Sequence, residues 1–176
     1  MSGKVKLVRV DNRLLHATVA LNWSRFVNAS QIIIVDEKSK GDLFFEQVLQ
    51  LSLPSTINVK ILSADQLLSF HQELERDTDA RKINIILLFK KISDVYSAYQ
   101  NGYPLKEVQI PYPASRFLIR KLDYYYDHKD LQKIRELQKN GIRFYYQTTP
   151  MDTKEYSIFE QIKTINVNKN ELKLNE

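Results

Sequence analysis

The chain has 176 residues, a formal net charge of +5 and no cysteine. This length suits one domain with a single substantial core. Without cysteine, disulfides and thiolate metal sites are excluded. No apolar run approaches the roughly 20 residues of a membrane-spanning helix, and the N-terminus lacks the apolar core of a signal peptide. These features predict a soluble, cytoplasmic protein.

The basic charge raises the question of nucleic-acid binding. Lysines and arginines are scattered among acidic residues, as in segments 73–77 and 135–139, with no basic block and no nucleic-acid motif. We therefore expect a solvated, mildly basic surface and no nucleic-acid partner. Such a surface would suit the electrostatic steering of an acidic protein partner. The alternative is a nucleic-acid-associated α/β protein, which a failure to bind DNA or RNA at low salt would exclude.

Short β-branched runs alternate with helical patterns along the chain. In chain order, the predicted strands are Lys4–Val10, Gln31–Val35, Asn58–Leu62, Ile83–Phe89, Glu107–Ile110 and Ile142–Gln147. The predicted helices are Val19–Val27, Asp42–Leu53, Asp65–Glu75, Ser93–Tyr99, Asp127–Lys139 and Tyr156–Ile165. Repeated strand-plus-helix units are typical of a parallel sheet with right-handed crossovers. The fold class is thus α/β, a mostly parallel, open twisted sheet with helices on both faces.

Four parts of the chain carry further expectations. In the first helix, the apolar residues are expected to be Val19, Leu21, Trp23 and Phe26. Residues 116–126 are rich in aromatic and β-branched side chains, which favours one strand or a bent hairpin and hence an antiparallel element near the C-terminal third. Residues 1–166 are expected to form one domain, because no repeat or linker interrupts them. The polar tail 167–176 has little to bury and is expected to fray.

Chemically suggestive residues gather just after the first predicted strand. His16 can act as a nucleophile at neutral pH, since an ordinary imidazole carries a free lone pair much of the time. Arg9 and Arg13 supply planar, permanently charged groups that match phosphate oxygens. Asp11 is placed to hold the imidazole in one tautomer. The combination indicates a phosphoryl group carried on His16.

The same residues carry a family resemblance. The run Arg-Val-Asp-Asn-Arg-Leu-Leu-His at 9–16, the helix with Trp23, and the strand and acidic pair at 31–37 resemble the IIB components of mannose-type (mannose, fructose and sorbose) sugar phosphotransferase systems. In that family the loop histidine takes a phosphoryl group from a IIA phosphohistidine and passes it to an imported sugar. The resemblance implies that His16 is the phosphohistidine, through Nδ1, with Arg9, Asp11 and Arg13 around it.

The resemblance also implies partners and an activity. The donor would be the IIA protein or domain of the same system, and the acceptor a sugar presented by the membrane IIC and IID components. The activity would be that of a protein-phosphohistidine–sugar phosphotransferase, without a diffusible cofactor. The protein would be cytoplasmic and peripherally associated with its membrane permease. A homodimer and the identity of the sugar are left open.

The sequence departs from the family pattern in three places. Asn12 replaces a usually acidic residue, and Ala17 and Thr18 replace a Gly-Gln pair after the histidine. A loop that is usually glycine-rich is here the segment 110–116. Alanine narrows the backbone conformations open to a position that glycine would leave free. The alternative function is therefore a transfer-impaired regulatory or phospho-sensing relative of the same fold.

Other polar residues are expected at the same rim of the sheet. Asn12, Asp36, Tyr112 and Thr149 follow predicted strands and are the candidates for binding substrate or phosphate, with Asp36 as a contact to the histidine loop. His71 and His128 are expected on the surface. The three histidines lack metal-ligand spacing, so no metal is expected.

Overall fold

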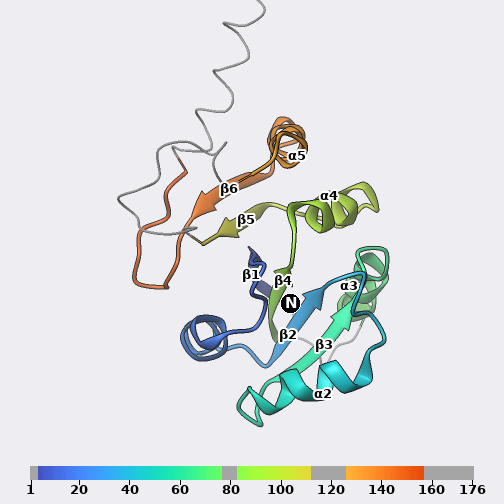
Figure 1. The fold of residues 1–176 in the computed structure, drawn as a ribbon, viewed down its shortest axis with the longest axis vertical. Helices are drawn as coiled ribbons and strands as arrows, with labels where there is room; N and C mark the ends of the chain where they lie inside the picture. The colour runs from blue at the N-terminus through green and yellow to red at the C-terminus, as the bar shows by residue number, and fades with distance from the viewer. Residues whose placement is uncertain (1–3, 77–82, 112–125, 157–176) are drawn as a thin grey trace, which may run out of the picture.

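The computed structural model describes residues 4–76, 83–111 and 126–156. Within these ranges, six strands form one open sheet in the order β3-β2-β4-β1-β5-β6 (Figure 1). The strands are β1 (Lys4–Val10), β2 (Gln31–Val35), β3 (Asn58–Leu62), β4 (Asn84–Phe89), β5 (Glu107–Ile110) and β6 (Arg143–Tyr146). The helices are η1 (Thr18–Trp23, a π-helix), α1 (Ser24–Phe26), α2 (Leu43–Leu51), α3 (Gln66–Arg76), α4 (Ile92–Gln100) and α5 (His128–Lys139).

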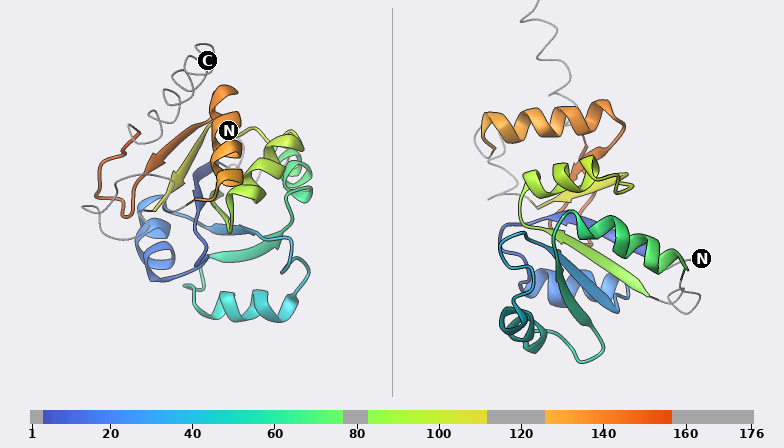
Figure 2. Two further views of the ribbon diagram at one scale, coloured as in Figure 1. Left: turned by 45° about the horizontal axis from the view of Figure 1, so that its top comes forward. Right: turned by 90° about the vertical axis from the view of Figure 1, so that its right-hand side faces the viewer.

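Helices cover both faces of this sheet (Figure 2). On one face, α3, α4 and α5 bury residues such as Leu67, Val95 and Ile134. On the other, η1 buries Val19 and Trp23, and α2 packs partly buried side chains against the same core. The central strands β2 and β4 are apolar on both sides, as expected for strands buried between two helical layers. This α/β architecture agrees with the prediction.

The predicted antiparallel element is wrong for the described sheet. Every pairing between named strands is parallel. The chain returns through a helix before it enters each next described strand of the β1–β5 series, and α5 precedes β6, so each strand enters from the same end. Among the described residues, an isolated antiparallel bridge joins Tyr146, the last residue of β6, to Glu155. Residues 112–125 and 157–176, where the hairpin, the last helix and the tail were predicted, lie outside the described ranges.

The first helix is present, but part of its expected apolar face is wrong. Leu21 is 44% exposed and Phe26 is 63% exposed. The reason is the winding of η1, in which the N–H of Ser24 bonds to the carbonyl of Val19, five residues earlier. That wider turn brings Val19, Ala20 and Trp23 to the core in place of an ordinary helical stripe.

Helix α2 covers the outer edge of β3 with polar side chains. The Gln50 amide accepts a hydrogen bond from Val59 N–H at 2.9 Å and donates one to the Ile57 carbonyl at 2.7 Å. Glu46 accepts from Ile61 N–H at 2.9 Å. These bonds satisfy backbone groups that an outer strand would otherwise present to other chains.

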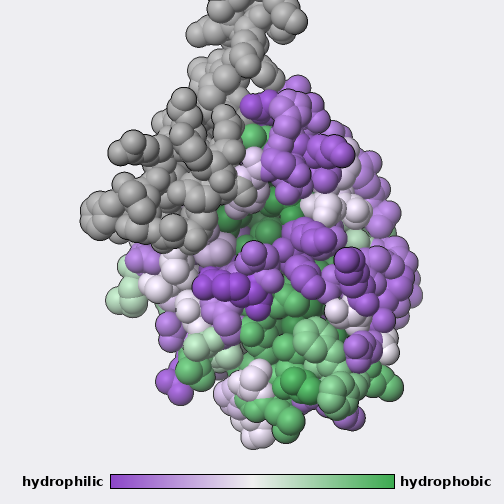
Figure 3. All heavy atoms as spheres, in the orientation of Figure 1, coloured by the Kyte–Doolittle hydropathy of each residue, from purple (hydrophilic) through white to green (hydrophobic). Residues whose placement is uncertain are grey.

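The outer face of α2 is apolar and exposed. Its large exposed side chains are Leu43, Phe44, Val48 and Leu51. They gather over α2 in the lower part of Figure 3. No residue of α2 is fully buried. Attachment of this helix therefore depends heavily on its polar bonds to β3.

A Gln50→Ala variant is expected to lower the free energy of unfolding by about 1–3 kcal/mol, because it leaves the Val59 N–H of β3 and the Ile57 carbonyl just before β3 without that amide. Urea unfolding at neutral pH measures the effect. Gln47→Ala, at an exposed position of the same helix, is the matched control and should change stability by less than about 0.5 kcal/mol. Equal effects of the two substitutions would contradict the role assigned to Gln50.

Candidate functional site

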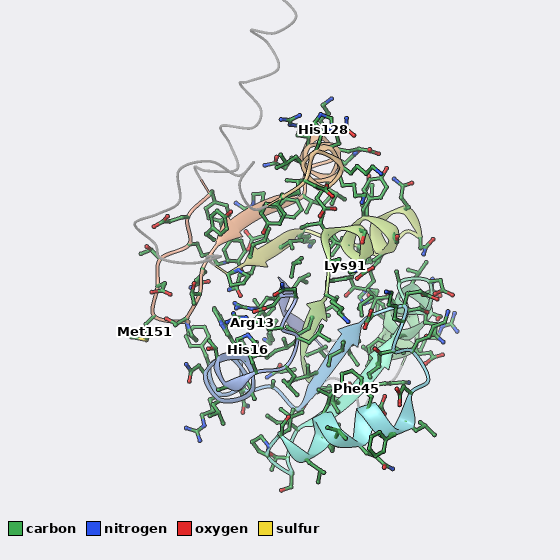
Figure 4. The ribbon with its side chains drawn as sticks, in the orientation of Figure 1. Arg13, His16, Phe45, Lys91, His128 and Met151 are labelled. Atoms are coloured by element: carbon green, nitrogen blue, oxygen red, sulfur yellow. The ribbon has the colours of Figure 1, made fainter. Side chains whose placement is uncertain are left out.

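The segment from Asp11 to Ala17 connects β1 to η1 at the carboxyl edge of the sheet. β1 and β4 are neighbours, but the chain leaves them toward opposite faces, since η1 joins one core and α4 the other. The space beyond their ends is a topological switch point, where open α/β sheets bind ligands. Figure 4 shows Arg13 and His16 close together beside this end of β1, and His128 far from them on α5.

Backbone contacts hold this loop in shape. Asp11 N–H donates to the carbonyl of Phe89 at the end of β4, at 2.9 Å. Leu14 N–H donates to the Asp11 carbonyl at 2.9 Å, and Leu14 has a positive φ of 53°. Such a conformation costs about 1–3 kcal/mol for a residue of this kind, and it persists here because the Leu14 side chain is buried in the core with η1. The loop is therefore anchored at its start, by Asp11, and at its middle, by Leu14.

Asp11 is the centre of the site. Its buried carboxylate accepts hydrogen bonds from Arg9 Nη2 at 2.9 Å, Arg13 Nε at 3.1 Å and His16 Nε2 at 2.9 Å. Burial alone would raise the pKa of Asp11, but the hydrogen bonds from Arg13 and His16 and the charge of Arg9 lower it to about 2. The carboxylate is thus ionised throughout the physiological range.

Arg9 is completely buried beneath the loop, whereas the Arg13 side chain is 58% exposed. Burial lowers the pKa of Arg9, and the adjacent Asp11 carboxylate opposes that effect. Two guanidinium groups therefore share one carboxylate. The resulting excess of positive charge favours an incoming phosphoryl group.

The His16 ring is oriented by its bond to Asp11. Its side chain is 20% exposed. Because the carboxylate is an acceptor only, Nε2 carries the proton and Nδ1 keeps the lone pair. The His16 carbonyl also accepts from Val19 and Ala20, which places the residue at the start of η1. The arrangement presents an imidazole with a fixed tautomer and a free nucleophilic nitrogen.

A cleft of about 420 Å³ opens beside the loop. Its walls come from the carboxyl ends of β1, β4 and β5 and from the start of α5; the polar lining residues are Asp11, Asn12, Arg13, Lys90, Lys91 and Asp130. His16 is not one of the lining residues, so Asp11 and Arg13 connect the histidine to the cleft. Two lysines and Arg13 give this cleft a basic rim.

The other predicted contact residues occupy different environments. Asn12 is exposed at the cleft. Asp36 is buried and accepts from Lys90 Nζ at 3.0 Å and Ser39 Oγ at 2.8 Å, and none of its bonds in the described structure goes to the histidine loop. Thr149 donates its backbone N–H and hydroxyl to Asp152 within a turn. Tyr112 lies outside the described residues.

Two glutamines that support the site were not predicted from the sequence. Gln109 and Gln147 join Arg9 in a buried polar network. Lys90, which the sequence places at the same rim because it follows a predicted strand, lines the cleft while paired with Asp36. The available signal was a glutamine in the short apolar strand β5, between Val108 and Ile110. A polar residue at a buried strand position needs a partner.

Ala17 has φ −49° and ψ −42°, ordinary right-handed helical geometry. An alanine is unstrained in that conformation, so the glycine of the family pattern is not required at this position.

Within the described ranges, no cluster of three or more His, Asp or Glu side chains is arranged to hold a metal ion. None of the helices in those ranges combines the length and hydropathy that a bilayer crossing requires.

Fold and site together define a class of protein. Its members have a parallel α/β sheet whose switch point carries a histidine that is oriented by a carboxylate and flanked by arginines. Residues 5–175 match the family described as the PTS system sorbose subfamily IIB component, and the chain belongs to this family. Its members are IIB components of phosphotransferase systems, and this chain is accordingly a phosphoryl carrier in sugar uptake. In such a system IIB works with IIA and IIC/IID components.

Individual relatives are distant. The sorbose-specific EIIB component of Klebsiella pneumoniae is 24% identical over 144 residues, which are 80% of this chain and 84% of the relative. The mannose-specific EIIAB component of Escherichia coli K12 is 22% identical over 152 residues, 85% of this chain but 46% of the relative. The chain thus spans about half of that longer protein.

Solved structures share the fold. The IIBSor domain of the sorbose permease from Klebsiella pneumoniae has a TM-score of 0.71 at 24% identity, covering 92% of this chain and 97% of that one. The N-acetylgalactosamine-specific IIB component 1 from Escherichia coli has a TM-score of 0.71 at 20% identity, covering 86% and 98%. At these identities the likeness concerns the fold alone.

Proposed function

We propose that His16 accepts a phosphoryl group from a IIA phosphohistidine and passes it to the sugar imported by the membrane IIC and IID components. The observation that carries the proposal is the 2.9 Å bond between His16 Nε2 and the ionised Asp11 carboxylate. That bond leaves Nδ1 as the attacking atom. Further support comes from the two arginines that share this carboxylate.

The first transfer follows from this geometry. The Nδ1 lone pair attacks phosphorus in line with the donor nitrogen, a P–N bond forms, and the donor P–N bond breaks as its electron pair returns to the donor imidazole. Nε2 keeps its proton, so the phosphorylated ring carries a positive charge that Asp11 stabilises. Arg13, with the positive excess around Arg9, offsets the charge on the three equatorial phosphoryl oxygens.

The second transfer reverses the roles. A sugar hydroxyl attacks phosphorus, the P–N bond to His16 breaks, and its electron pair returns to Nδ1 while the hydroxyl proton is released. His16 is restored as the neutral Nε2–H tautomer. The activity is thus that of a protein-phosphohistidine–sugar phosphotransferase, and it uses no diffusible cofactor.

The proposal also assigns Asn12, Asp36 and Thr149 lesser parts. Asn12 is exposed beside Arg13 and is proposed as a phosphate or donor contact. Asp36 would act through Lys90, whose ammonium it holds at the rim of the cleft. Thr149 would support the turn beside Trp23, whose Nε1 donates to the neighbouring Thr148 carbonyl at 2.9 Å. We place this activity in the cytoplasm, at the permease.

The proposal is tested by phosphorylation of the purified full chain. Phosphoenolpyruvate, the general phosphotransferase proteins and a mannose-type IIA should transfer one acid-labile, base-stable phosphoryl group. We expect peptide mapping to place it at His16 and ¹⁵N NMR to place it on Nδ1. A protein that stays unmodified with a range of IIA donors would contradict active transfer. Phosphorylation without onward transfer to sugar would instead support the regulatory or phospho-sensing alternative.

A further inference from the structure

A buried chain of hydrogen bonds extends the histidine site across the sheet. Arg9 Nη1 donates to Gln109 Oε1 at 2.5 Å, Gln109 Nε2 donates to Gln147 Oε1 at 3.2 Å, and Gln147 Nε2 donates to the Asp152 carbonyl at 2.8 Å. Each donor in this chain lies on the Arg9 side of its acceptor, which fixes the orientation of the Gln109 and Gln147 amides. Because Arg9 can only donate, residue 109 must present an acceptor atom to it.

Gln109 is the residue of β5 that pairs with Arg9 of β1 in the sheet. Both side chains are completely buried. The Arg9 guanidinium is therefore held between two groups, the Asp11 carboxylate on one side and the neutral Gln109 amide on the other. Longer contacts from Arg9 Nη1 reach the carbonyls of Gln147 at 3.4 Å and Thr148 at 3.5 Å.

We propose that Gln109 is a positioning residue for phosphoryl transfer, because it gives the buried Arg9 an acceptor without adding a negative charge to the site. This inference rests on the proposed function for its effect on transfer. An apolar side chain at this position would leave an Arg9 donor poorly satisfied in the interior. A carboxylate would satisfy that donor but would cancel the positive excess that Arg9 and Arg13 hold over Asp11.

The excess of positive charge around Asp11 is small, so a single added charge changes it substantially. With neutral His16, the charges of Arg9, Arg13 and Asp11 leave one net positive charge beside the position of the phosphoryl group. One additional buried carboxylate would reduce it to zero. A second anion on Arg9 would also weaken the attraction of Arg9 for Asp11 and raise the cost of bringing in a phosphoryl dianion.

Two substitutions of similar size separate charge from packing. Gln109→Glu keeps an acceptor and adds a charge, whereas Gln109→Met removes the acceptor and adds none. Both lose the amide donor to Gln147, so that loss is common to the pair. We expect Gln109→Glu to slow phosphoryl acceptance about 10-fold or more and Gln109→Met to slow it less than about 3-fold, although Gln109→Met is the less stable of the two.

A second measurement does not depend on any phosphoryl donor. The dissociation constant for inorganic phosphate, followed by NMR, should be about 3-fold or more higher in Gln109→Glu than in Gln109→Met, since an added negative charge repels the phosphate dianion. Gln47→Glu adds the same charge to the exposed face of α2 and should change neither this dissociation constant nor the rate of phosphoryl acceptance.

Equal phosphate dissociation constants in Gln109→Glu and Gln109→Met, or transfer rates that follow stability in the two variants, would overturn the charge role of Gln109. A wild-type chain that accepts no phosphoryl group would instead refute the proposed function. The phosphate-binding measurement would still decide whether the charge at position 109 acts on the site, so the two failures are distinguishable.

Discussion

A His16→Ala variant is expected to accept no phosphoryl group and to remain folded. The substitution removes the imidazole that Asp11 orients, so the proposed transfer has no acceptor. The side chain is partly exposed, and Asp11 keeps its bonds to Arg9 and Arg13 when the ring is removed. The free energy of unfolding should therefore fall by no more than about 1.5 kcal/mol. Phosphorylation with IIA and urea unfolding measure the two effects.

His71→Ala and His128→Ala are the matched controls. His71 lies on α3, 3.5 Å from Glu75, and its ring packs against Tyr103 at 5.4 Å between centroids. His128 is exposed at the start of α5. Both variants should be phosphorylated to the wild-type level. Residual acid-labile phosphate on His16→Ala would mean that another residue carries the group.

The sequence predicted the strands well because the physical signal is local. Four of the six, β1, β2, β3 and β5, have the predicted bounds; β4 begins one residue later than predicted, and β6 begins one residue later and ends one residue earlier. Continuous apolar runs such as Ile32–Val35 are buried on both faces, which leaves little freedom in their assignment. The centre of the site could also be predicted from a local signal, because its four residues lie within positions 9–16. In the structure, Arg9, Arg13 and His16 all bond to the Asp11 carboxylate.

What the sequence could not predict depends on contacts between distant segments. Gln109 reaches Arg9 only because β1 and β5 are neighbours, an order that element patterns do not specify. Asp36 was expected beside the histidine loop, yet it bonds to Lys90, the residue that directly follows the adjacent strand β4. The exposure of Leu21 follows from π-helical winding, which a period of 3.6 residues does not describe.

An Asp11→Asn variant is expected to lose about 3–5 kcal/mol of stability at neutral pH and at least about 100-fold in the rate of phosphoryl acceptance. The stability falls because the completely buried Arg9 guanidinium loses its charge partner. Transfer falls because an amide can donate toward Nε2, which favours the tautomer with the proton on Nδ1 and removes the attacking lone pair. Urea unfolding and phosphorylation kinetics measure the two losses.

The stability difference should depend on pH in a defined direction. The pKa of Asp11 is lowered from 3.8 to about 2 in the folded state, so the ionised carboxylate stabilises the native protein. This contribution, roughly 2–3 kcal/mol, is present above about pH 4–5 and disappears as the pH falls toward 2. The wild type loses it in that range, whereas an asparagine does not titrate. The gap between wild type and Asp11→Asn should therefore narrow as the pH is lowered from 5 to 2.

Asp127→Asn is the matched control for this titration, since its side chain accepts from Asp130 N–H at the start of α5 and asparagine is an equally good cap. Its stability difference from wild type should stay small from pH 7 to pH 3. If Asp11→Asn does not fold, Arg9→Met combined with Asp11→Asn removes both charges and should recover part of the lost stability. A gap for Asp11→Asn that stays constant down to pH 2 would mean that Asp11 does not hold Arg9, Arg13 and His16 by its charge, and the proposed orientation of Nδ1 would lose its physical basis.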